Sequence, residues 1–270
     1  MQPPDPLRRN NVSLAGNAGA ARTMVFVHGF GTDQTAWEKL AEAFGGDYRI
    51  VLLDNGGAGK SDGEAFDRDE SRYLNLRGYA SDLIEIGEAL NLGDAVLVGH
   101  SMGAMVAALA AIERPALFAR LVLIGASPRY LDAEGYRGGF TKADWQEINL
   151  AVANKYALWA DAFAPLAMDN PDRPELARYF AESIKAIPVR RAFTVLYSIF
   201  QSDCRSDLPK LKIPTLIIQS AADRAVPLEA AEYLHQHIEG SQLSVIDATG
   251  HLPHVSAPEE VISAMRNFGL

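Results

Sequence analysis

The stretch Ala95-Val96-Leu97-Val98-Gly99-His100-Ser101-Met102-Gly103 decides the fold of this chain of 270 residues. Residues 95–99 are apolar or small and are typical of a buried strand, whereas residues 102–114 continue as a helical run. A serine in so tight a turn requires small residues two positions before and after it, and glycines stand at both positions. The pattern predicts a nucleophile elbow, whose strained turn lifts the Ser101 hydroxyl clear of a sheet.

Two backbone N–H groups are candidates for stabilising negative charge beside Ser101. Met102 is placed at the positive N-terminus of the helical run 102–114. A second donor is expected after strand 24–28, where His28-Gly29-Phe30-Gly31 stands, so Phe30 and Met102 are the predicted oxyanion hole. As alternatives, Phe30 is an ordinary loop hydrophobe and His28 a structural hydrogen-bonding residue.

A serine hydroxyl is a poor nucleophile alone and needs a base. Elbows of this kind are followed along the chain by Asp or Glu and then by His. His251 follows strand 242–247 through a loop that contains glycine, at the sheet edge where ligands of open α/β sheets gather. We therefore favour His251 over His254, and we place His235 and His237 on a surface helix, 228–238.

The acid that orients this base is predicted to be Asp223, in the loop that follows strand 214–219. Its alternative role is to cap the next helix with its carboxylate. The competing position lies after strand 121–125, where the first carboxylate is Asp132. The predicted triad is Ser101, His251 and Asp223.

Apolar β-rich runs alternate with amphipathic helical patterns along most of the chain. The strand runs are nearly continuous, which is typical of a parallel sheet with helices on both faces. The prediction is an α/β fold with a mostly parallel sheet, to which residues 12–15 add an antiparallel edge strand. The predicted strands are 24–28, 49–54, 95–99, 121–125, 214–219 and 242–247, and the helices between them are 34–44, 76–90, 102–114, 228–238 and 259–268.

Residues 130–205 interrupt this alternation with helical patterns at 142–161 and 174–185 and with no convincing strand. We predict a helical insertion, with residues 1–129 and 206–270 forming the core domain. Residues 130–200 hold 12 of the 23 aromatic residues, about twice their share by length. These aromatics either form a small core of the inserted helices or line a pocket.

Composition excludes several classes of protein. The chain has 25 Lys and Arg against 34 Asp and Glu, a net charge of −9, which disfavours nucleic acid and anionic membrane as partners. Apolar residues make up 48%, enough for a sizeable core, but no run reaches the roughly 20 residues of a membrane-spanning helix. Cys204 is the only cysteine, which suits a reducing compartment, so we expect the cytoplasm.

Several further patterns carry no chemistry. Residues 54–61 end like a phosphate-binding loop, but Asp54 stands where its first glycine is required. The spacings of His235 with His237 and of His251 with His254 lack a carboxylate or cysteine cluster, so no metal site is predicted. The charge run 67–72 is predicted to be a solvated loop. Residues 1–9 contain no apolar signal segment and are expected to fray.

Over residues 10–268 the chain resembles the RsbQ-like branch of the α/β-hydrolases, which also includes the plant strigolactone and karrikin receptors. Beyond the elbow, the resemblance rests on residues 28–34 (HGFGTDQ), 121–130 (LVLIGASPRY), 138–140 (GGF), 164–167 (APLA), 250–254 (GHLPH) and 256–258 (SAP).

The resemblance implies a Ser101, Asp223, His251 triad beneath a lid of four helices in a V arrangement, formed by residues 130–205, over a deep and mostly apolar pocket. It also implies substrate-binding roles for residues that match the family's pocket walls, and it places His100 beside the nucleophile. These predicted wall residues are Phe30, Tyr130, Phe140, Trp159, Phe163 and Phe200.

Family members hydrolyse small esters and butenolide lactones, and some act as receptors or in stress signalling. The resemblance and the triad together predict a serine hydrolase of small apolar esters or lactones that forms an acyl-enzyme and uses neither cofactor nor metal. The alternative is a butenolide-like receptor with slow or single-turnover hydrolysis and a protein signalling partner. A carbon-carbon bond hydrolase with the same triad is the third interpretation.

Overall fold

A seven-stranded sheet in the order β1-β3-β2-β4-β5-β6-β7 organises the chain in a computed structural model that describes residues 4–270. β1 pairs antiparallel with β3, and every other neighbouring pair is parallel. The predicted strands and the antiparallel edge are thereby confirmed. The strands are β1 (Ser13–Gly16), β2 (Thr23–Val27), β3 (Arg49–Leu52), β4 (Ala95–His100), β5 (Phe118–Ile124), β6 (Thr215–Ala222) and β7 (Gln242–Thr249).

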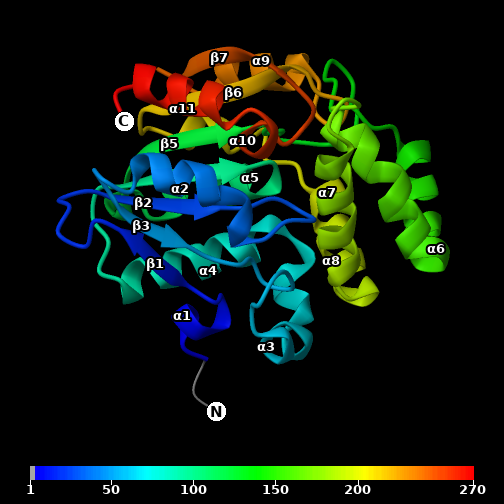
Figure 1. Cartoon of the computed structure of the whole chain (residues 1–270), viewed down its shortest axis with the longest axis horizontal. Helices are drawn as coiled ribbons and strands as arrows, with labels where there is room; N and C mark the ends of the chain where they lie inside the picture. Colours follow the sequence, from blue (N-terminus) through cyan, green and yellow to red (C-terminus); the bar gives the residue numbers. More distant parts are fainter. Residues whose placement is uncertain (1–3) are drawn as a thin grey trace.

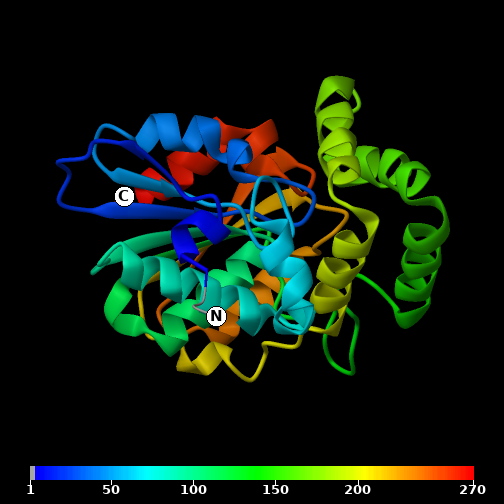
Figure 2. The same ribbon diagram turned by 90° about the horizontal axis from the view of Figure 1, so that it is seen from below.

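Helices cover both faces of this sheet, as Figure 2 shows for α2 and α11 on one face and α4 and α5 on the other. Along β2, Val25 packs into one core while Met24 and Phe26 pack into the other, which explains why the strands are hydrophobic without alternation. The five predicted helices are confirmed, the first of them as a short 3₁₀ turn followed by α2. They are η1 (Gln34–Trp37) with α2 (Glu38–Phe44), α4 (Leu76–Ala89), α5 (Met102–Glu113), α9 (Leu228–His237) and α11 (Pro258–Asn267).

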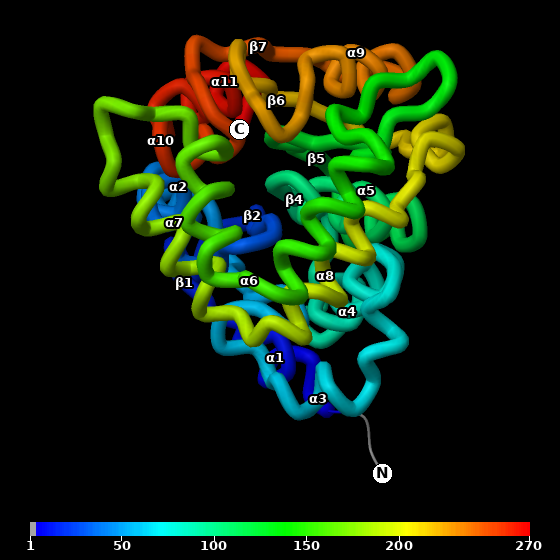
Figure 3. The backbone as a smooth tube through the Cα atoms, turned by 90° about the vertical axis from the view of Figure 1, so that its right-hand side faces the viewer, coloured from blue at the N-terminus to red at the C-terminus, as the bar shows by residue number. Residues whose placement is uncertain are grey.

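Three helices are inserted between β5 and β6 and lie together beyond one end of the sheet (Figures 1 and 3). They are α6 (Lys142–Met168), α7 (Pro174–Ala186) and α8 (Val189–Gln201). The backbone of Lys155 is non-helical, with φ −146° and ψ 45°, so α6 consists of two segments and the insertion has four helical segments. The sequence patterns located α6 and α7. They missed α8, although apolar residues recur at helical spacing along it.

The N-terminal segment corrects one expectation. Residues 6–9 do not fray but form helix α1 (Pro6–Arg9), while residues 1–3 lie outside the described chain. Arg9 is buried because its guanidinium lies 3.0 Å from the carboxylate of Asp82 and 2.6 Å from that of Glu85. A buried carboxylate such as Asp82 requires counter-charge, and Arg9 supplies part of it from a distant part of the chain, together with Arg72 at 2.6 Å.

The charge run 67–72 is a second correction, since it is largely exposed to solvent as predicted but is not a loop. It spans the end of α3 (Gly63–Arg68) and the turn η2 (Glu70–Leu74), which face α8. Arg191 binds both carboxylate oxygens of Asp67, at 2.9 and 2.8 Å, and Glu70 pairs with Arg190. The inserted helices are therefore tied to the core by ion pairs. The remaining short elements are η3 (Pro115–Leu117), η4 (Leu208–Lys210) and α10 (Pro253–Ser256).

Two features are absent from residues 4–270. No helix in this part of the chain is both long and apolar enough to cross a membrane. Nor do three or more His, Cys, Asp or Glu side chains gather there in a way that would hold a metal ion.

Candidate active site

Ser101 lies in a sharp turn between β4 and α5. Its backbone has φ 54° and ψ −123°, a left-handed conformation that is strained for any residue with a Cβ. A Cβ on Gly99 would lie 2.5 Å from Ala104 Cα, and one on Gly103 would lie 2.3 Å from the His28 carbonyl oxygen. Both flanking glycines are thus required by close approach of backbone, which is the geometry predicted for the elbow.

The three residues of the predicted triad form one hydrogen-bonded chain. His251 Nε2 lies 2.9 Å from Ser101 Oγ, and His251 Nδ1 lies 2.8 Å from Asp223 Oδ2. β4, β6 and β7 deliver them, since Ser101, Asp223 and His251 follow the carboxyl ends of these strands. The arrangement allows His251 to accept the Ser101 proton while Asp223 holds its other nitrogen protonated.

Asp223 remains a carboxylate in this environment. Burial pushes the pKa of Asp223 upward, but the neighbouring His251 and hydrogen bonds from His251 and two backbone N–H groups outweigh it, so the pKa falls below its ordinary value. The N–H groups belong to Ala225 and Val226, which donate to Oδ1 at 2.8 and 3.0 Å. The carboxylate therefore orders its own loop as well, while the N-cap of α9 is Pro227.

The competing candidates lie elsewhere. Asp132 is exposed and accepts the N–H groups of Gly138 and Gly139 at 2.8 and 3.0 Å in a loop of the insertion. His254 is fully buried, its ring 4.3 Å from that of His100, and burial lowers its pKa to about 3. His254 makes no hydrogen bond with Ser101, whose Oγ contacts His251 and Tyr130.

The two predicted oxyanion donors have no hydrogen-bond acceptor within residues 4–270. Met102 is the first residue of α5, where an N–H has no partner inside the helix. Phe30 follows β2, and its ring lines the cavity above Ser101. Both N–H groups thus remain available to a ligand.

A cavity of about 60 Å³ lies over the nucleophile and is lined almost entirely by apolar side chains. It is much smaller than the deep pocket that the resemblance implied. Five of the predicted wall residues line it, whereas Phe180, Leu196, Ile199 and Ala225 were not predicted. Its walls are Phe30, Ser101, Tyr130, Phe140, Phe163, Phe180, Leu196, Ile199, Phe200, Ala225 and His251.

Two predicted substrate-binding residues do not line this cavity. His100 is buried behind the triad, where its Nε2–H donates to the His251 carbonyl oxygen at 2.8 Å. The ring of Trp159 stacks on that of Phe163, with centroids 5.1 Å apart, and faces an outer pocket of about 460 Å³. The sequence positions of both residues predicted that they lie near the site, but their side chains point away from this cavity.

The inner cavity and the outer pocket share Phe140, Phe163 and Ala225. These residues therefore form the partition between the two spaces. The aromatic surplus of the insertion serves both predicted purposes, because Phe163 lines the cavity and also packs against the core of α6 and α7.

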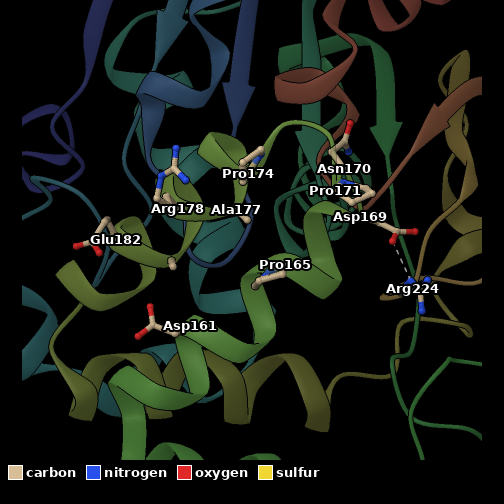
Figure 4. A pocket seen from close by; sticks show the side chains of 11 residues that line it. Asp161, Pro165, Asp169, Asn170, Pro171, Pro174, Ala177, Arg178, Glu182 and Arg224 are labelled. Atoms are coloured by element: carbon tan, nitrogen blue, oxygen red, sulfur yellow. Dashed lines mark ion pairs between the residues drawn. The ribbon is translucent and has the colours of Figure 1, made fainter.

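A larger hollow of about 650 Å³ lies between α6 and α7 but contains none of the triad residues (Figure 4). Ser101 and His251 line the smaller cavity and not this hollow. At the rim of the hollow, Arg224 pairs with Asp169 at 3.1 Å (Figure 4). Arg224 follows Asp223 directly, so this pair joins the loop of the acid to the end of α6.

The end of α6 also holds the loop of the base. The backbone N–H of His251 donates to the Ala167 carbonyl oxygen at 2.7 Å, and Thr249 Oγ1 donates to that of Asp169 at 3.0 Å. The packing is so close that a Cβ on Gly250 would overlap the Met168 carbonyl oxygen, 1.9 Å away. The inserted helices therefore directly support the loops that carry Asp223 and His251.

Comparisons with known proteins agree with this fold. The family model described as alpha/beta hydrolase fold matches residues 22–258. The chain is 40% identical to a karrikin insensitive 2 receptor of Petunia hybrida over 95% of this chain and 94% of the relative, and 39% identical to a strigolactone esterase of Pisum sativum over 92% of each. A solved hydrolase from Oleispira antarctica superimposes with a TM-score of 0.93 and 31% identity, covering 99% of this chain and 97% of that one. The chain therefore belongs to the α/β-hydrolase fold family.

Proposed function

We propose that this protein hydrolyses small carboxylic esters or lactones through an acyl-enzyme on Ser101. The observation that carries the proposal is the continuous chain from Asp223 through His251 to Ser101, with contacts of 2.8 and 2.9 Å, which opens on an apolar cavity. The relative from Pisum sativum, a strigolactone esterase, supports ester chemistry in this family.

In the proposed mechanism His251 Nε2 removes the Ser101 proton while Oγ attacks the substrate carbonyl. The N–H groups of Phe30 and Met102 stabilise the oxyanion, and His251 returns the proton to the leaving oxygen. A water activated by His251 then attacks the acyl-enzyme and releases the acid. The negative charge of Asp223 stabilises the protonated His251 in both halves of the reaction.

The cavity sets the size of the substrate. With a volume of about 60 Å³ and apolar walls, it suits a small acyl group or a lactone ring beside Ser101. The outer pocket, whose rim carries Asp144, Glu147 and Arg224, is placed to receive the remainder of a larger substrate. We therefore infer that residues 130–205 act as a lid on a core of residues 1–129 and 206–270.

We also propose that the protein works in the cytoplasm. The single cysteine, Cys204, is buried and free, which suits a protein that works in the reducing cytoplasm.

A receptor role is the second candidate, favoured by the likeness to the karrikin insensitive 2 receptor. In that case hydrolysis is slow or stops after one acyl transfer, and the lid contacts a protein signalling partner. The same triad serves both roles, so the number of turnovers distinguishes them.

The test is a panel of aryl esters of increasing acyl length together with butenolides, with the intact mass of the protein followed over time. A catalyst releases many equivalents of product, and its mass returns to that of the free protein. A receptor releases about one equivalent and retains the added mass. Both roles would be contradicted if no member of the panel released product or added mass to the protein.

Replacing Phe163 with alanine is expected to join the cavity to the outer pocket and shift the preferred acyl length upward. Because Phe163 is only partly buried, the loss of stability should stay below the about 3 to 5 kcal/mol of a fully buried Phe. The measurements are kcat/KM across the ester series and the thermal midpoint.

Phe193→Ala is the matched control, since Phe193 lies on lid helix α8 and does not line the cavity. It should leave the ranking of esters unchanged. If Phe163→Ala keeps the wild-type ranking while its midpoint drops sharply, Phe163 is lid core and the assigned wall is wrong.

A further inference from the structure

The hydroxyl of Tyr130 lies 3.2 Å from Ser101 Oγ. Tyr130 stands in the loop between β5 and the lid and is 4% exposed, and its side chain lines the cavity. Ser101 Oγ is the only hydrogen-bond partner of this hydroxyl within residues 4–270. The Tyr130 hydroxyl is therefore a polar group of the lid side of the cavity that contacts the Ser101 oxygen directly, whereas the neighbouring wall residues are apolar.

The direction of this hydrogen bond follows from the rest of the site. His251 Nδ1 carries a proton for the Asp223 carboxylate, so Nε2 accepts the single proton of Ser101 Oγ. Ser101 Oγ is then left with lone pairs only, and Tyr130 must donate. Burial raises the pKa of Tyr130 above its ordinary value, so the phenol keeps its proton throughout the neutral range.

We propose that Tyr130 is a catalytic residue that donates a hydrogen bond to Ser101 Oγ as this atom gains negative charge. The inference rests on the proposed serine mechanism. Charge develops on Oγ when His251 removes its proton during attack, and again when Oγ leaves the second tetrahedral intermediate. His251 takes and returns the proton in each case, while Tyr130 retains its own.

This contact accelerates the reaction because it strengthens between ground state and transition state. In the resting enzyme Tyr130 donates to a neutral hydroxyl, whereas in the transition state it donates to a partly anionic oxygen, and charge-assisted hydrogen bonds are about twice as strong. The contact is with the enzyme's own nucleophile and not with the substrate. Its loss should therefore slow all substrates alike and leave their binding unchanged.

Tyr130→Phe tests the proposal because it removes the hydroxyl and keeps the ring that lines the cavity. The acylation and deacylation rate constants should both fall about tenfold, by the same factor for every ester in the series, with little change in KM. Acylation is followed in single-turnover experiments by release of the aryl alcohol, and deacylation by loss of the acyl mass.

Tyr136→Phe is the matched control. Tyr136 belongs to the same loop and is buried, and its hydroxyl contacts Ser127 Oγ at 3.0 Å and the Arg129 carbonyl oxygen at 2.9 Å without touching Ser101. Its rate constants should match those of the wild type. The thermal midpoints of both variants are measured first, so that the rate constants can be determined at a temperature at which each variant is fully folded.

The proposal would be overturned if the rate constants of Tyr130→Phe stay within twofold of wild type. It would also be overturned if only KM changes, or if the decrease in the rate constants varies from ester to ester. Such results would make Tyr130 a wall of the pocket alone. They leave the serine mechanism intact as long as Ser101→Ala is inactive. If Ser101→Ala retains hydrolysis, the proposed function itself fails, and the role of Tyr130 fails with it.

Discussion

Ser101→Ala is expected to reduce ester hydrolysis by more than about 10³-fold while the protein remains folded. The hydroxyl forms the covalent bond to the acyl group, and no other group in the cavity can replace it, since His251 and Tyr130 are the other polar side chains among its described walls. Alanine fits the same space and keeps the backbone of the turn. The measurements are kcat/KM with a short aryl ester and the thermal midpoint.

A buried serine outside the site provides the control. Ser198 lies on lid helix α8, is fully buried, and donates to the Val195 carbonyl oxygen at 2.8 Å. Ser198→Ala should keep the wild-type rate, with at most a modest loss of stability. More than a tenth of wild-type activity in Ser101→Ala would rule out the serine mechanism.

The sequence predicted those parts of the site that depend on short stretches of chain. The elbow is a short motif, although only Gly99 is required by contacts within the turn, with Ala104, whereas Gly103 is required by the carbonyl oxygen of His28 after β2. Asp223 and His251 were located because each follows a strand of a parallel sheet, and such strands bring their carboxyl ends to one edge. Topology therefore joined residues that are 28 and 150 positions apart.

Features that depend on side-chain direction or on distant partners were not predicted. His100 and Trp159 occupy the expected places in the chain but face away from the cavity. Arg9 is ordered by Glu85, 76 positions away, and Asp67 is bound by Arg191, 124 positions away. Neither pairing leaves a periodic pattern in the sequence, because ion pairs across a fold depend on how the elements pack.

The end of α6 contacts the loops that carry Asp223 and His251. Its Ala167 carbonyl accepts the N–H of His251, and Asp169 holds Arg224 beside the acid. The ion pair is largely exposed and contributes little by itself, whereas the backbone contact is buried. The position of His251 is therefore supported by α6 as well as by β7.

Asp223→Asn should reduce kcat/KM by about 10⁴-fold, the scale typical when a triad aspartate becomes an amide. The N–H groups of Ala225 and Val226 donate to Oδ1, so the amide oxygen of asparagine takes that position and its NH₂ group faces His251. Nδ1 of His251 must then accept, and the ring proton moves to Nε2. In that tautomer Nε2 cannot accept the proton of Ser101.

Asp132→Asn is the control that tests the position of the acid in the chain. Asp132 uses one oxygen to accept the N–H groups of Gly138 and Gly139, and an asparagine oxygen accepts them equally well. Its kcat/KM should stay within twofold of wild type, measured on the same ester and with thermal midpoints for both variants. Similar losses in the two variants would show that Asp223 does not orient the base. A loss in Asp223→Asn alone, with the midpoint retained, would trace the effect to the loss of the carboxylate beside His251, because the fold and the nucleophile are unchanged.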